Sequence, residues 1–433
     1  MTEDRYQSYQ ETPVKWLKTI PSHWEVRKLK FLATIQNGQD YKNVEAEFGE
    51  SSYPVFGSGG AFTKASQFLY DGESVLFGRK GTIDKPLHIH EKFWTVDTMF
   101  YSHLHADTNG RYFYYQATTI QYSLIATQTA LPSITQFDLS NYFLCFPPLP
   151  EQTQIARFLD YKTAQLDQLI AQKQALIERL NEQRIALITQ AVTRGLNPAA
   201  PLKNSGLEWL GQVPKGWEVK RLRFLSAGIE QGWSPQCDAN PAEDDQWGVL
   251  KVGCVNGNEL DPLENKALPG SLDAREEYEI QPGDILISRA NTKELLGSAA
   301  IVPATIRKQL LLCDKLYRLK PAEEIDPEFL VFVLRTPIAR YQYEREATGA
   351  SGSMQNIGQD TIKNLTIPVP PFTEQQAIVE QLKADLVKKD KMLSLTEDTI
   401  ARLEEYRTAL ITAAVTGKID VRGFKLPETA HDA

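Results

Sequence analysis

Two short segments combine basic and polar side chains with glycine or serine directly after an apolar run. The first is Phe77-Gly78-Arg79-Lys80-Gly81-Thr82, with candidate residues Arg79, Lys80 and Thr82. The second is Ile287-Ser288-Arg289-Ala290-Asn291-Thr292-Lys293, with candidate residues Ser288, Arg289, Asn291, Thr292 and Lys293. Arginine and lysine can hydrogen-bond to guanine, asparagine can pair with adenine, and serine or threonine can hold phosphates. Each segment predicts a DNA-contacting loop, with an ordinary solvated turn as the alternative.

Two polar segments and a glycine-rich turn extend this candidate surface. Residues 128–133 correspond to residues 349–356, and we expect both to form polar loops near the same surface. Their candidate contact residues are Gln128, Ser133, Ser353, Gln355 and Asn356. Gly57-Ser58-Gly59-Gly60 matches neither the dinucleotide-binding nor the Walker A pattern. It predicts a tight turn, with close approach of Ser58 to a DNA phosphate as the alternative.

The sequence offers no match to the catalytic motifs that such a surface would serve. An amino-methyltransferase needs an Asn/Asp-Pro-Pro-aromatic loop, but Val369-Pro370-Pro371-Phe372 puts valine at the key position. Phe146-Pro147-Pro148-Leu149 lacks both ends of that loop, so each Pro-Pro pair predicts the end of a domain before a helix. No close cluster of carboxylates and lysine suggests a nuclease. We therefore predict a non-enzymatic chain with no cofactor and no metal of its own.

The cysteines and tryptophans are predicted to be structural. Cys145, Cys237, Cys254 and Cys313 are scattered without a C-x-x-C pair, so we expect reduced and mostly buried thiols. For Trp94, Trp233 and Trp247 a place in the core is favoured over stacking on bases.

Composition describes a folded chain of several domains. A length of 433 residues favours two to four units. Contents of 42% hydrophobic and 24% charged residues indicate a chain that folds into packed cores in water. No run of 18 apolar residues and no apolar leader in residues 1–10 is present, so we expect a cytoplasmic protein without a membrane partner. The net charge of −8 argues against nucleic acid unless the acidic residues lie away from the contact surface.

The strongest pattern is an internal duplication. Trp16-Leu17 and residues 20–32 return 193 positions later as Trp209-Leu210 and residues 213–225. Residues 146–152 return 223 positions later as 369–375, and residues 184–189 return as 407–412. The 30-residue difference lies wholly within residues 33–145 and 226–368. Each half is therefore a divergent module followed by a module of fixed length, which is typical of a rigid spacer.

Each module of fixed length predicts a long helix. Residues 151–193 contain neither glycine nor proline and carry apolar residues at heptad spacing. We assign the contact seam to Ile155, Leu159, Leu166, Leu169, Leu176, Leu180 and Leu187, with Ile170 and Ile177 beside it. In the second copy the equivalent positions are Ile378, Leu382, Met392, Leu403 and Leu410. Equal length and chain order favour antiparallel pairing, and two independent amphipathic helices are the alternative.

The divergent modules predict mixed α/β domains. Strands are expected at residues 75–77, 93–96, 285–288 and 311–312, and helices at 328–335 and 340–345. The fold class is therefore α/β, with two recognition domains joined by an antiparallel coiled coil in a pseudo-twofold repeat. The predicted boundaries are domain 1 at 1–146, helix 1 at 147–195, a linker at 196–208, domain 2 at 209–369, helix 2 at 370–417 and a tail at 418–433.

These motifs together resemble type I restriction-modification specificity subunits. The resemblance rests on the repeated Trp-Glu-Val segment, Gly78-Arg79-Lys80-Gly81-Thr82, residues 93–98, residues 288–292 and the Pro-Pro-x-x-Glu-Gln helix starts. It implies that the recognition domains read a split site in double-stranded DNA. It also implies two methyltransferase subunits, one against each half, and motor-nuclease subunits that join them. S-adenosylmethionine, ATP and magnesium would be held by those partners.

Two other classes of function stay open at this point. One is an interaction protein whose coiled coil tethers two ligand-binding domains that do not bind DNA. The other is an autonomous restriction-methylation enzyme, against which the missing methyltransferase loop argues.

Overall fold

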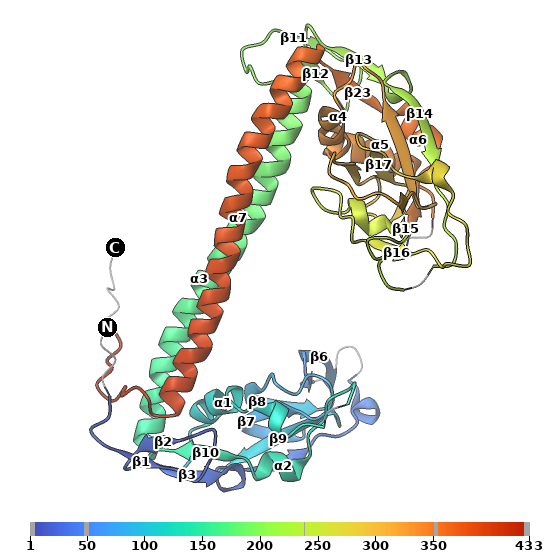
Figure 1. The fold of residues 1–433 in the computed structure, drawn as a ribbon. Coiled ribbons are helices and arrows are strands. Elements are labelled where there is room, and N and C mark those ends of the chain that lie inside the picture. The colour runs from blue at the N-terminus through green and yellow to red at the C-terminus, as the bar shows by residue number, and fades with distance from the viewer. Residues whose placement is uncertain (1–4, 47–51, 128, 238, 350–353, 428–433) are drawn as a thin grey trace. The chain divides into compact units, whose positions relative to one another are not determined.

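The computed structural model describes residues 5–46, 52–127, 129–237, 239–349 and 354–427. The chain divides into two compact units (Figure 1), each described by itself below. Unit 1 is built from residues 1–175 and 397–433, and unit 2 from residues 176–396. Each unit contains one mixed α/β domain and about half of each of two long helices, which confirms the predicted fold class.

The domain of unit 1 centres on a six-stranded sheet in the order β4-β9-β7-β8-β5-β6. Its strands are β4 (Ala33–Asn37), β5 (Tyr53–Gly57), β6 (Gly60–Ala65), β7 (Tyr70–Gly78), β8 (Leu87–Thr95) and β9 (Met99–Leu104). The β5–β8 pair is parallel, and the other four pairs are antiparallel. Along β7, Val75 and Phe77 pack with helix α1 (Gly110–Thr118), whereas Leu76 packs on the opposite face with Phe93. This alternation is the two-residue period of a strand covered on both faces.

Smaller elements connect this sheet to the long helices. The remaining elements of unit 1 before the long helix are β1 (Tyr9–Glu11), β2 (Thr19–Pro21), β3 (Glu25–Lys28), η1 (Leu29–Phe31), η2 (Lys42–Val44), η3 (Tyr122–Leu124), α2 (Gln136–Ser140) and β10 (Phe143–Phe146). β1 pairs with β2, and β3 pairs with β10, both antiparallel. The β3–β10 ladder joins the start of the domain to its end, directly before the first long helix.

Unit 2 repeats this frame around different sheets. Its strands are β11 (Leu202–Asn204), β12 (Gln212–Pro214), β13 (Glu218–Arg221), β14 (Ser226–Gln231), β15 (Gly248–Leu250), β16 (Asn265–Ala267), β17 (Ile285–Ser288), β18 (Ala290–Asn291), β19 (Ala299–Ile301), β20 (Leu310–Leu311), β21 (Leu316–Pro321), β22 (Gln355–Asn356) and β23 (Thr366–Val369). Its shorter helices are η4 (Leu222–Phe224), η5 (Val252–Val255), η6 (Glu276–Tyr278), α4 (Pro327–Leu334), α5 (Pro337–Glu346) and α6 (Gln359–Asn364). The main sheets are β14-β21-β17-β19 and β16-β15-β20. The ladders β11–β12 and β13–β23 repeat β1–β2 and β3–β10.

The two long helices are α3 (Leu149–Arg194) and α7 (Phe372–Val415), and they pair antiparallel within each unit. In unit 1, Leu159 and Leu166 share a core with Leu410, and Arg407 Nε lies 2.8 Å from Asp167 Oδ1. In unit 2, Ala191 and Val192 share a core with Ile378 and Leu382, and Arg184 lies 2.6 Å from Asp390. The second ion pair repeats the first at an offset of 223 residues with the helices exchanged. The predicted antiparallel pairing is confirmed.

The predicted contact seam needs a correction at three positions, two in α3 and one in α7. Leu169 and Leu176 are exposed, whereas Ile170 and Ile177, which we placed beside the seam, are half-buried. In α7, likewise, the predicted seam residue Met392 is exposed, whereas its neighbour Leu393 is half-buried. Apolar residues stand side by side at these positions, so heptad spacing alone could not choose between them. Leu159, Leu166 and Leu180 are buried as predicted.

A buried glutamine fixes domain 1 to its long helix. Gln152 is the last residue of the first Pro-Pro-x-x-Glu-Gln motif and is fully buried. Its Nε2 donates to the carbonyls of Pro147 (2.9 Å) and Asp107 (3.0 Å). Its Oε1 accepts from the backbone N–H of Asn109 (2.8 Å), which caps helix α1. One amide therefore ties the first turn of α3 to the start of α1.

The same junction recurs in unit 2. Gln375 Nε2 donates to the carbonyls of Pro370 (2.9 Å) and Glu324 (3.1 Å). Its Oε1 accepts from the N–H of Asp326 (2.7 Å), which caps helix α4. The repeated motif is therefore a structural joint, as the Pro-Pro prediction implied.

The predicted linker, residues 196–208, and the predicted tail, residues 418–433, both include segments that pair or pack with the domains. Residues 202–204 form β11, which pairs with β12. Beyond α7, Ile419 and Val421 belong to the core of unit 1, and the Phe424 ring contacts Phe158 at 5.1 Å between centroids. Gly195 and Gly417 have φ of 75° and 70°, the left-handed conformation expected where a helix stops. Among the described residues, no helix is both long and apolar enough to span a bilayer.

Candidate nucleic-acid interface

In unit 1 the candidate interface is built around Arg79, at the end of β7. Its N–H donates to the carbonyl of Thr98 (2.8 Å), and its own carbonyl accepts from Ile134 N–H (3.0 Å). Its guanidinium donates weakly to the carbonyl of Asp97 (3.4 Å) and lies 5.8 Å from the centroid of the Phe100 ring. The strand end, a main-chain acceptor and an aromatic ring thus hold this cation, which stays half-buried.

In unit 2, Arg289 at the end of β17 is held in the same way. Its N–H donates to the carbonyl of Lys315 (2.9 Å), and its carbonyl accepts from Ile357 N–H (2.9 Å). Its Nη1 donates to the carbonyl of Asp314 (3.2 Å), and its guanidinium lies 5.9 Å from the centroid of the Tyr317 ring. The Nε of Arg289 is buried and has no hydrogen-bond partner. Two modules with different sheets therefore place one arginine in equivalent surroundings.

The residues that position these arginines were missed from the sequence. Asp97 to Phe100 and Asp314 to Tyr317 share the spacing Asp-x-x-aromatic, which spans the start of the strand that pairs with β7 or β17. That spacing was available as a signal. Its significance depends on the strand pairing, which sequence spacing does not give.

Gly78, directly before Arg79, lets the main chain of this loop approach itself closely. A Cβ on Gly78 would lie 2.0 Å from the carbonyl oxygen of Thr82, so only glycine allows the chain to fold back here. Lys80 is exposed and forms an isolated bridge with Ser133. A cavity of about 380 Å³ beside them is lined by Asn37, Arg79, Lys80, Phe100, Ser133, Ile134, Thr135 and Gln136. The structure therefore brings the predicted residues Arg79, Lys80 and Ser133 together.

The equivalent loop of unit 2 uses other side chains. β18 pairs with β22, which sets Ala290 opposite Asn356 and Asn291 opposite Gln355. Thr292 and Lys293 are exposed at the loop's tip. The half-buried Gln355 has a buried Oε1 without a hydrogen-bond partner.

The remaining predicted residues lie in varied surroundings. Ser288 is fully buried and donates to the carbonyl of Leu295 (2.9 Å). Asn291 is buried, and its amide donates to Asn256 Oδ1 (2.9 Å). Both side chains are used within the fold and face no exposed surface. Thr82 is exposed, and Ser58 is half-buried in the β5–β6 turn, away from the residues that line the cavity. Gln128 and Ser353 lie outside the described residues.

The tryptophans and cysteines behave largely as structural residues. Trp94 is buried and donates to the carbonyl of Gln39 (3.0 Å), and Trp233 and Trp247 pack on a core of unit 2. Cys145, Cys254 and Cys313 are buried, and Cys237 is partly exposed.

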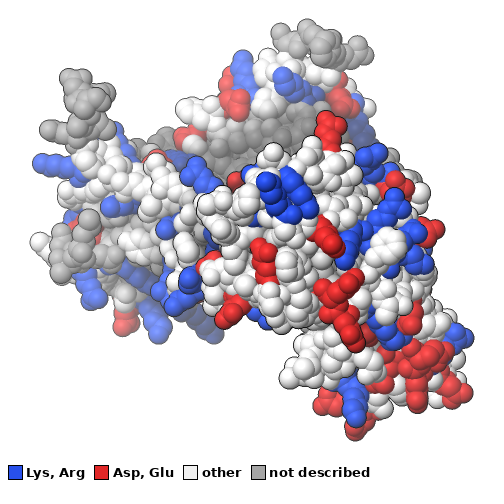
Figure 2. All heavy atoms as spheres, turned by 90° about the horizontal axis from the view of Figure 1, so that it is seen from above, with Lys and Arg blue, Asp and Glu red and all other residues white. Residues whose placement is uncertain are grey.

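Charge is unevenly distributed over the surface despite the net value of −8. Figure 2 shows mostly basic side chains at the left of the view and many acidic ones at the lower right, with the two kinds mixed in between. Local basic groups are what phosphate contact requires, because the potential of a nearby cation acts over about 10 Å at moderate salt. The net charge of the chain therefore does not describe the charge of each part of its surface.

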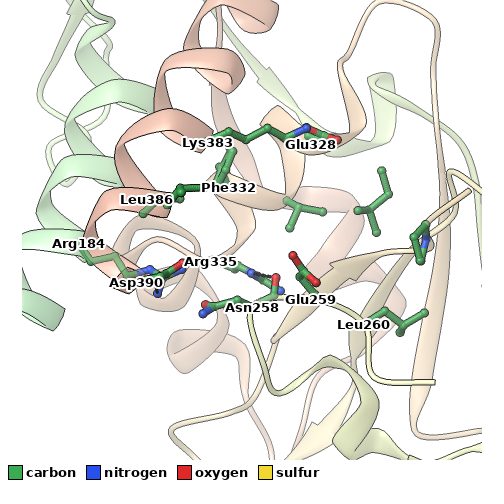
Figure 3. Close-up of a pocket in the computed structure, with 14 residues that line it drawn as sticks. Arg184, Asn258, Glu259, Leu260, Glu328, Phe332, Arg335, Lys383, Leu386 and Asp390 are labelled. Atoms are coloured by element: carbon green, nitrogen blue, oxygen red, sulfur yellow. Dashed lines mark hydrogen bonds and ion pairs between the residues drawn. The ribbon is translucent and has the colours of Figure 1, made fainter. Parts of the chain in front are cut away.

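A second concave feature in unit 2 lies between α4, residues 258–260 and α7 (Figure 3). The cavity measures about 520 Å³, and its apolar walls include Leu260, Ile301, Val331, Phe332 and Leu386. Lys383 pairs with Glu328 and Arg184 with Asp390 at its edge. Burial, with a smaller effect of nearby Arg184, lowers the pKa of Arg335 to about 10. Arg335 donates to three main-chain carbonyls, so these cations are already occupied within the fold.

Comparison with known proteins identifies one family in both halves of the chain. The model of the family described as "Type I restriction modification DNA specificity domain" matches residues 21–179 and 214–405. The type I restriction enzyme EcoEI specificity subunit of Escherichia coli is 29% identical over 210 residues, which are 48% of this chain and 35% of that protein. The EcoKI specificity subunit of Escherichia coli (strain K12) is 24% identical over 432 residues, covering 92% of this chain and 90% of that protein.

The fold has a solved counterpart. A structure described as "Structural basis underlying complex assembly and conformational transition of the type I R-M system" contains a chain with a TM-score of 0.67 and 16% identity. The match covers 92% of this chain and 99% of that chain. The family matches cover most of both repeats, and the matched domain confers DNA specificity, not catalysis. The chain therefore belongs to the type I restriction-modification DNA specificity family, as a non-catalytic specificity subunit.

Proposed function

We propose that each domain of this chain binds one half of a split DNA site. The observation that carries the proposal is the equivalent placement of Arg79 and Arg289 at the ends of β7 and β17. Around them stand exposed or half-buried side chains that differ between the domains. These are Lys80, Thr82 and Ser133 in unit 1, and Thr292, Lys293, Gln355 and Asn356 in unit 2. Ser58, in the separate β5–β6 turn, is a further candidate contact of unit 1. Arg79 and Arg289, which are equivalent, would bind the phosphates that both half-sites have in common. The residues that differ between the domains would read the bases.

The partners follow from the duplication. A repeated surface can bind the same partner twice, so we propose two methyltransferase subunits, one on each half, with restriction-translocase subunits joining that assembly. Methyl transfer, ATP hydrolysis and cleavage would be partner reactions that use the partners' S-adenosylmethionine, ATP and magnesium. The complex would act in the cytoplasm, where host and invading DNA are exposed to it.

The paired helices would set the unread gap between the half-sites. Matched lengths, repeated ion pairs and a buried glutamine at the start of each helix support a spacer of fixed length. Gap length would then depend on the number of residues in α3 and α7, and not on the loops.

A module exchange tests the proposal. Residues 226–368 would be replaced by the corresponding segment of another specificity subunit, and the modified sites in the host genome would be mapped. We expect one half-site to change while the other half-site and the gap stay the same. The control exchanges residues 33–145, which should change only the opposite half-site. A change in both half-sites after either exchange would contradict independent reading by the two domains.

A further inference from the structure

One large aromatic side chain is exposed at the same place in both halves. Phe31 is 55% exposed at the end of η1, and Phe224, its equivalent 193 residues later, is 66% exposed at the end of η4. The leucines on either side of each phenylalanine are buried, so the motif supports the fold through them. Exposure of a phenylalanine ring to water does not stabilise the fold. Its recurrence at the same place in both halves therefore suggests a shared surface function.

Basic residues and an asparagine frame each phenylalanine. The exposed Lys30 has its Nζ 5.4 Å from the centroid of the Phe31 ring. Lys28 donates to Asn141 Oδ1 (3.1 Å), at the end of α2. In unit 2 the exposed Arg223 donates to Asn364 Oδ1 at the end of α6, 223 residues after Asn141. We name these groups the Phe31 patch (Lys28, Lys30, Phe31, Asn141) and the Phe224 patch (Arg221, Arg223, Phe224, Asn364).

The main chain under both patches is the same. Leu29 N–H donates to the carbonyl of Tyr142 (2.8 Å), and Leu222 N–H donates to the carbonyl of Leu365 (2.8 Å). These bonds continue the repeated ladders β3–β10 and β13–β23. The basic residues and the phenylalanine of each patch therefore belong to the repeated frame, and Asn141 and Asn364 lie near the ends of the divergent modules at equivalent positions.

Each patch is separated from the arginine loop of its own unit. In unit 1, β4 begins two residues after Phe31 and ends at Asn37, which lines the cavity beside Arg79. In unit 2, β14 begins two residues after Phe224 and ends at Gln231, whose Nε2 donates to the carbonyl of Asp314 that also accepts from Arg289. A strand of five or six residues spans about 17–20 Å. In both units the patch and the arginine loop thus lie at opposite ends of one strand.

We infer that the two patches are docking sites for two copies of one partner protein. The partner surface that fits is an apolar pocket bordered by carboxylates, because each patch presents a phenylalanine beside exposed cations. The inference rests on the proposed function, in which that partner is the methyltransferase subunit. A partner bound twice needs a surface that is the same in both halves, and the divergent modules do not supply one.

The test is the number and affinity of methyltransferase subunits bound by the full-length chain. The methyltransferase subunit encoded with this chain would be titrated against it, and sedimentation velocity would give the stoichiometry. We expect two copies on the unchanged chain and one high-affinity site in Phe31→Ala or Phe224→Ala. The double variant should bind each copy about 30-fold more weakly or worse, the loss typical of an aromatic anchor at an interface.

Matched controls separate this effect from loss of exposed apolar area in general. Phe62 is 55% exposed on β6, and Leu263 is 73% exposed in unit 2. The variant Phe62→Ala/Leu263→Ala should bind two copies with unchanged affinity. Lys30→Glu/Arg223→Glu is a second test, which keeps both rings and should weaken binding most at low salt. Thermal unfolding of all variants should match the unchanged chain.

The possible results distinguish the two claims. If the unchanged chain binds no methyltransferase subunit, the proposed partner is wrong and the inference falls with it. If the chain binds two copies and the double phenylalanine variant binds them equally well, the proposed function stands and the inference is overturned. Loss of DNA binding with methyltransferase binding intact would also overturn it, because the patches would then be DNA contacts.

Discussion

The placement of Arg79 and Arg289 suggests what kind of contact these side chains make. The two domains differ in their sheets and loops, yet each arginine has the same main-chain and aromatic neighbours. Two different half-sites need not have any bases in common, but both present phosphates at regular spacing. We therefore expect these two arginines to bind phosphate, and Lys80 or Lys293 to contribute to base reading.

Arg79→Ala should weaken binding to specific and non-specific duplex DNA by the same factor. A hydrogen bond to a charged group contributes about 1.5–3 kcal/mol, which corresponds to about 10- to 100-fold in affinity. The slope of log affinity against log salt should fall by about one, because one fewer phosphate is neutralised. Fluorescence anisotropy of the assembled complex over a salt series measures both quantities.

Lys92 provides a control in the same sheet, since it lies on β8 paired with Asp71. Lys92→Ala should leave affinity and salt slope unchanged. Relaxed preference at a single base pair in Arg79→Ala, with an unchanged salt slope, would instead show that this arginine reads a base.

The buried cysteines should be unreactive in the folded chain. Burial raises the pKa of Cys145 and of Cys313 to about 12, so at pH 8 only about one thiol in ten thousand is a thiolate. Iodoacetamide labelling followed by mass spectrometry should modify both sites slowly in the native chain and rapidly in urea. Equal rates in both states would contradict the buried placement of these thiols.

At the scale of elements, the joints between domain and helix rest on Gln152 and Gln375. Each amide satisfies two carbonyls and one N–H that the fold buries. The sequence motif marked the joint, but the prediction relied on its prolines and missed the role of the glutamine. Two of the three bonds of each glutamine reach residues more than 40 positions away, and only the packing of α1 or α4 against the long helix reveals them.

Gln375→Leu should lower the free energy of unfolding by about 1–3 kcal/mol, the cost of leaving buried polar groups without partners. Gln376 is exposed on the same helix turn, and Gln376→Leu is the matched control, with an expected change within about 0.5 kcal/mol. Urea unfolding followed by circular dichroism measures both variants. Equal stability of the two would show that this joint is not held by the buried amide.

The contact seam between the long helices shows which of their features the heptad spacing predicts and which it does not. Neither glycine nor proline interrupts α3 between residues 151 and 193, so its existence and length were predictable. The choice between Leu169 and Ile170 was not, because both are apolar and adjacent. Which one faces α7 depends on the rotation of the helix about its axis, and the domains attached at the Gln152 and Gln375 joints constrain that rotation.

For the whole molecule, the duplication predicted the architecture better than any local motif did. The two offsets separated the variable modules from the modules of fixed length, and the structure has long helices where the length is fixed. The candidate site was less predictable. Ser288 and Asn291 have the chemistry of DNA contacts, but their burial follows from strand pairing and from contacts across loops, which the sequence pattern does not contain.

The central claim is that two paired helices of nearly equal length, 46 and 44 residues, hold the half-sites at a fixed gap. The direct test removes one heptad from both helices at repeat-equivalent positions, residues 169–175 and 392–398, which keeps the seam in phase. Seven residues shorten a helix by about 10 Å, or up to about three base pairs of B-DNA.

The modified chain would be expressed with its methyltransferase partner in a host lacking other such systems, and the methylated sites in the genome would be mapped. We predict the same two half-sites separated by a gap shorter by up to about three base pairs. Unchanged half-sites at the original gap, methylated as efficiently as before, would contradict the claim.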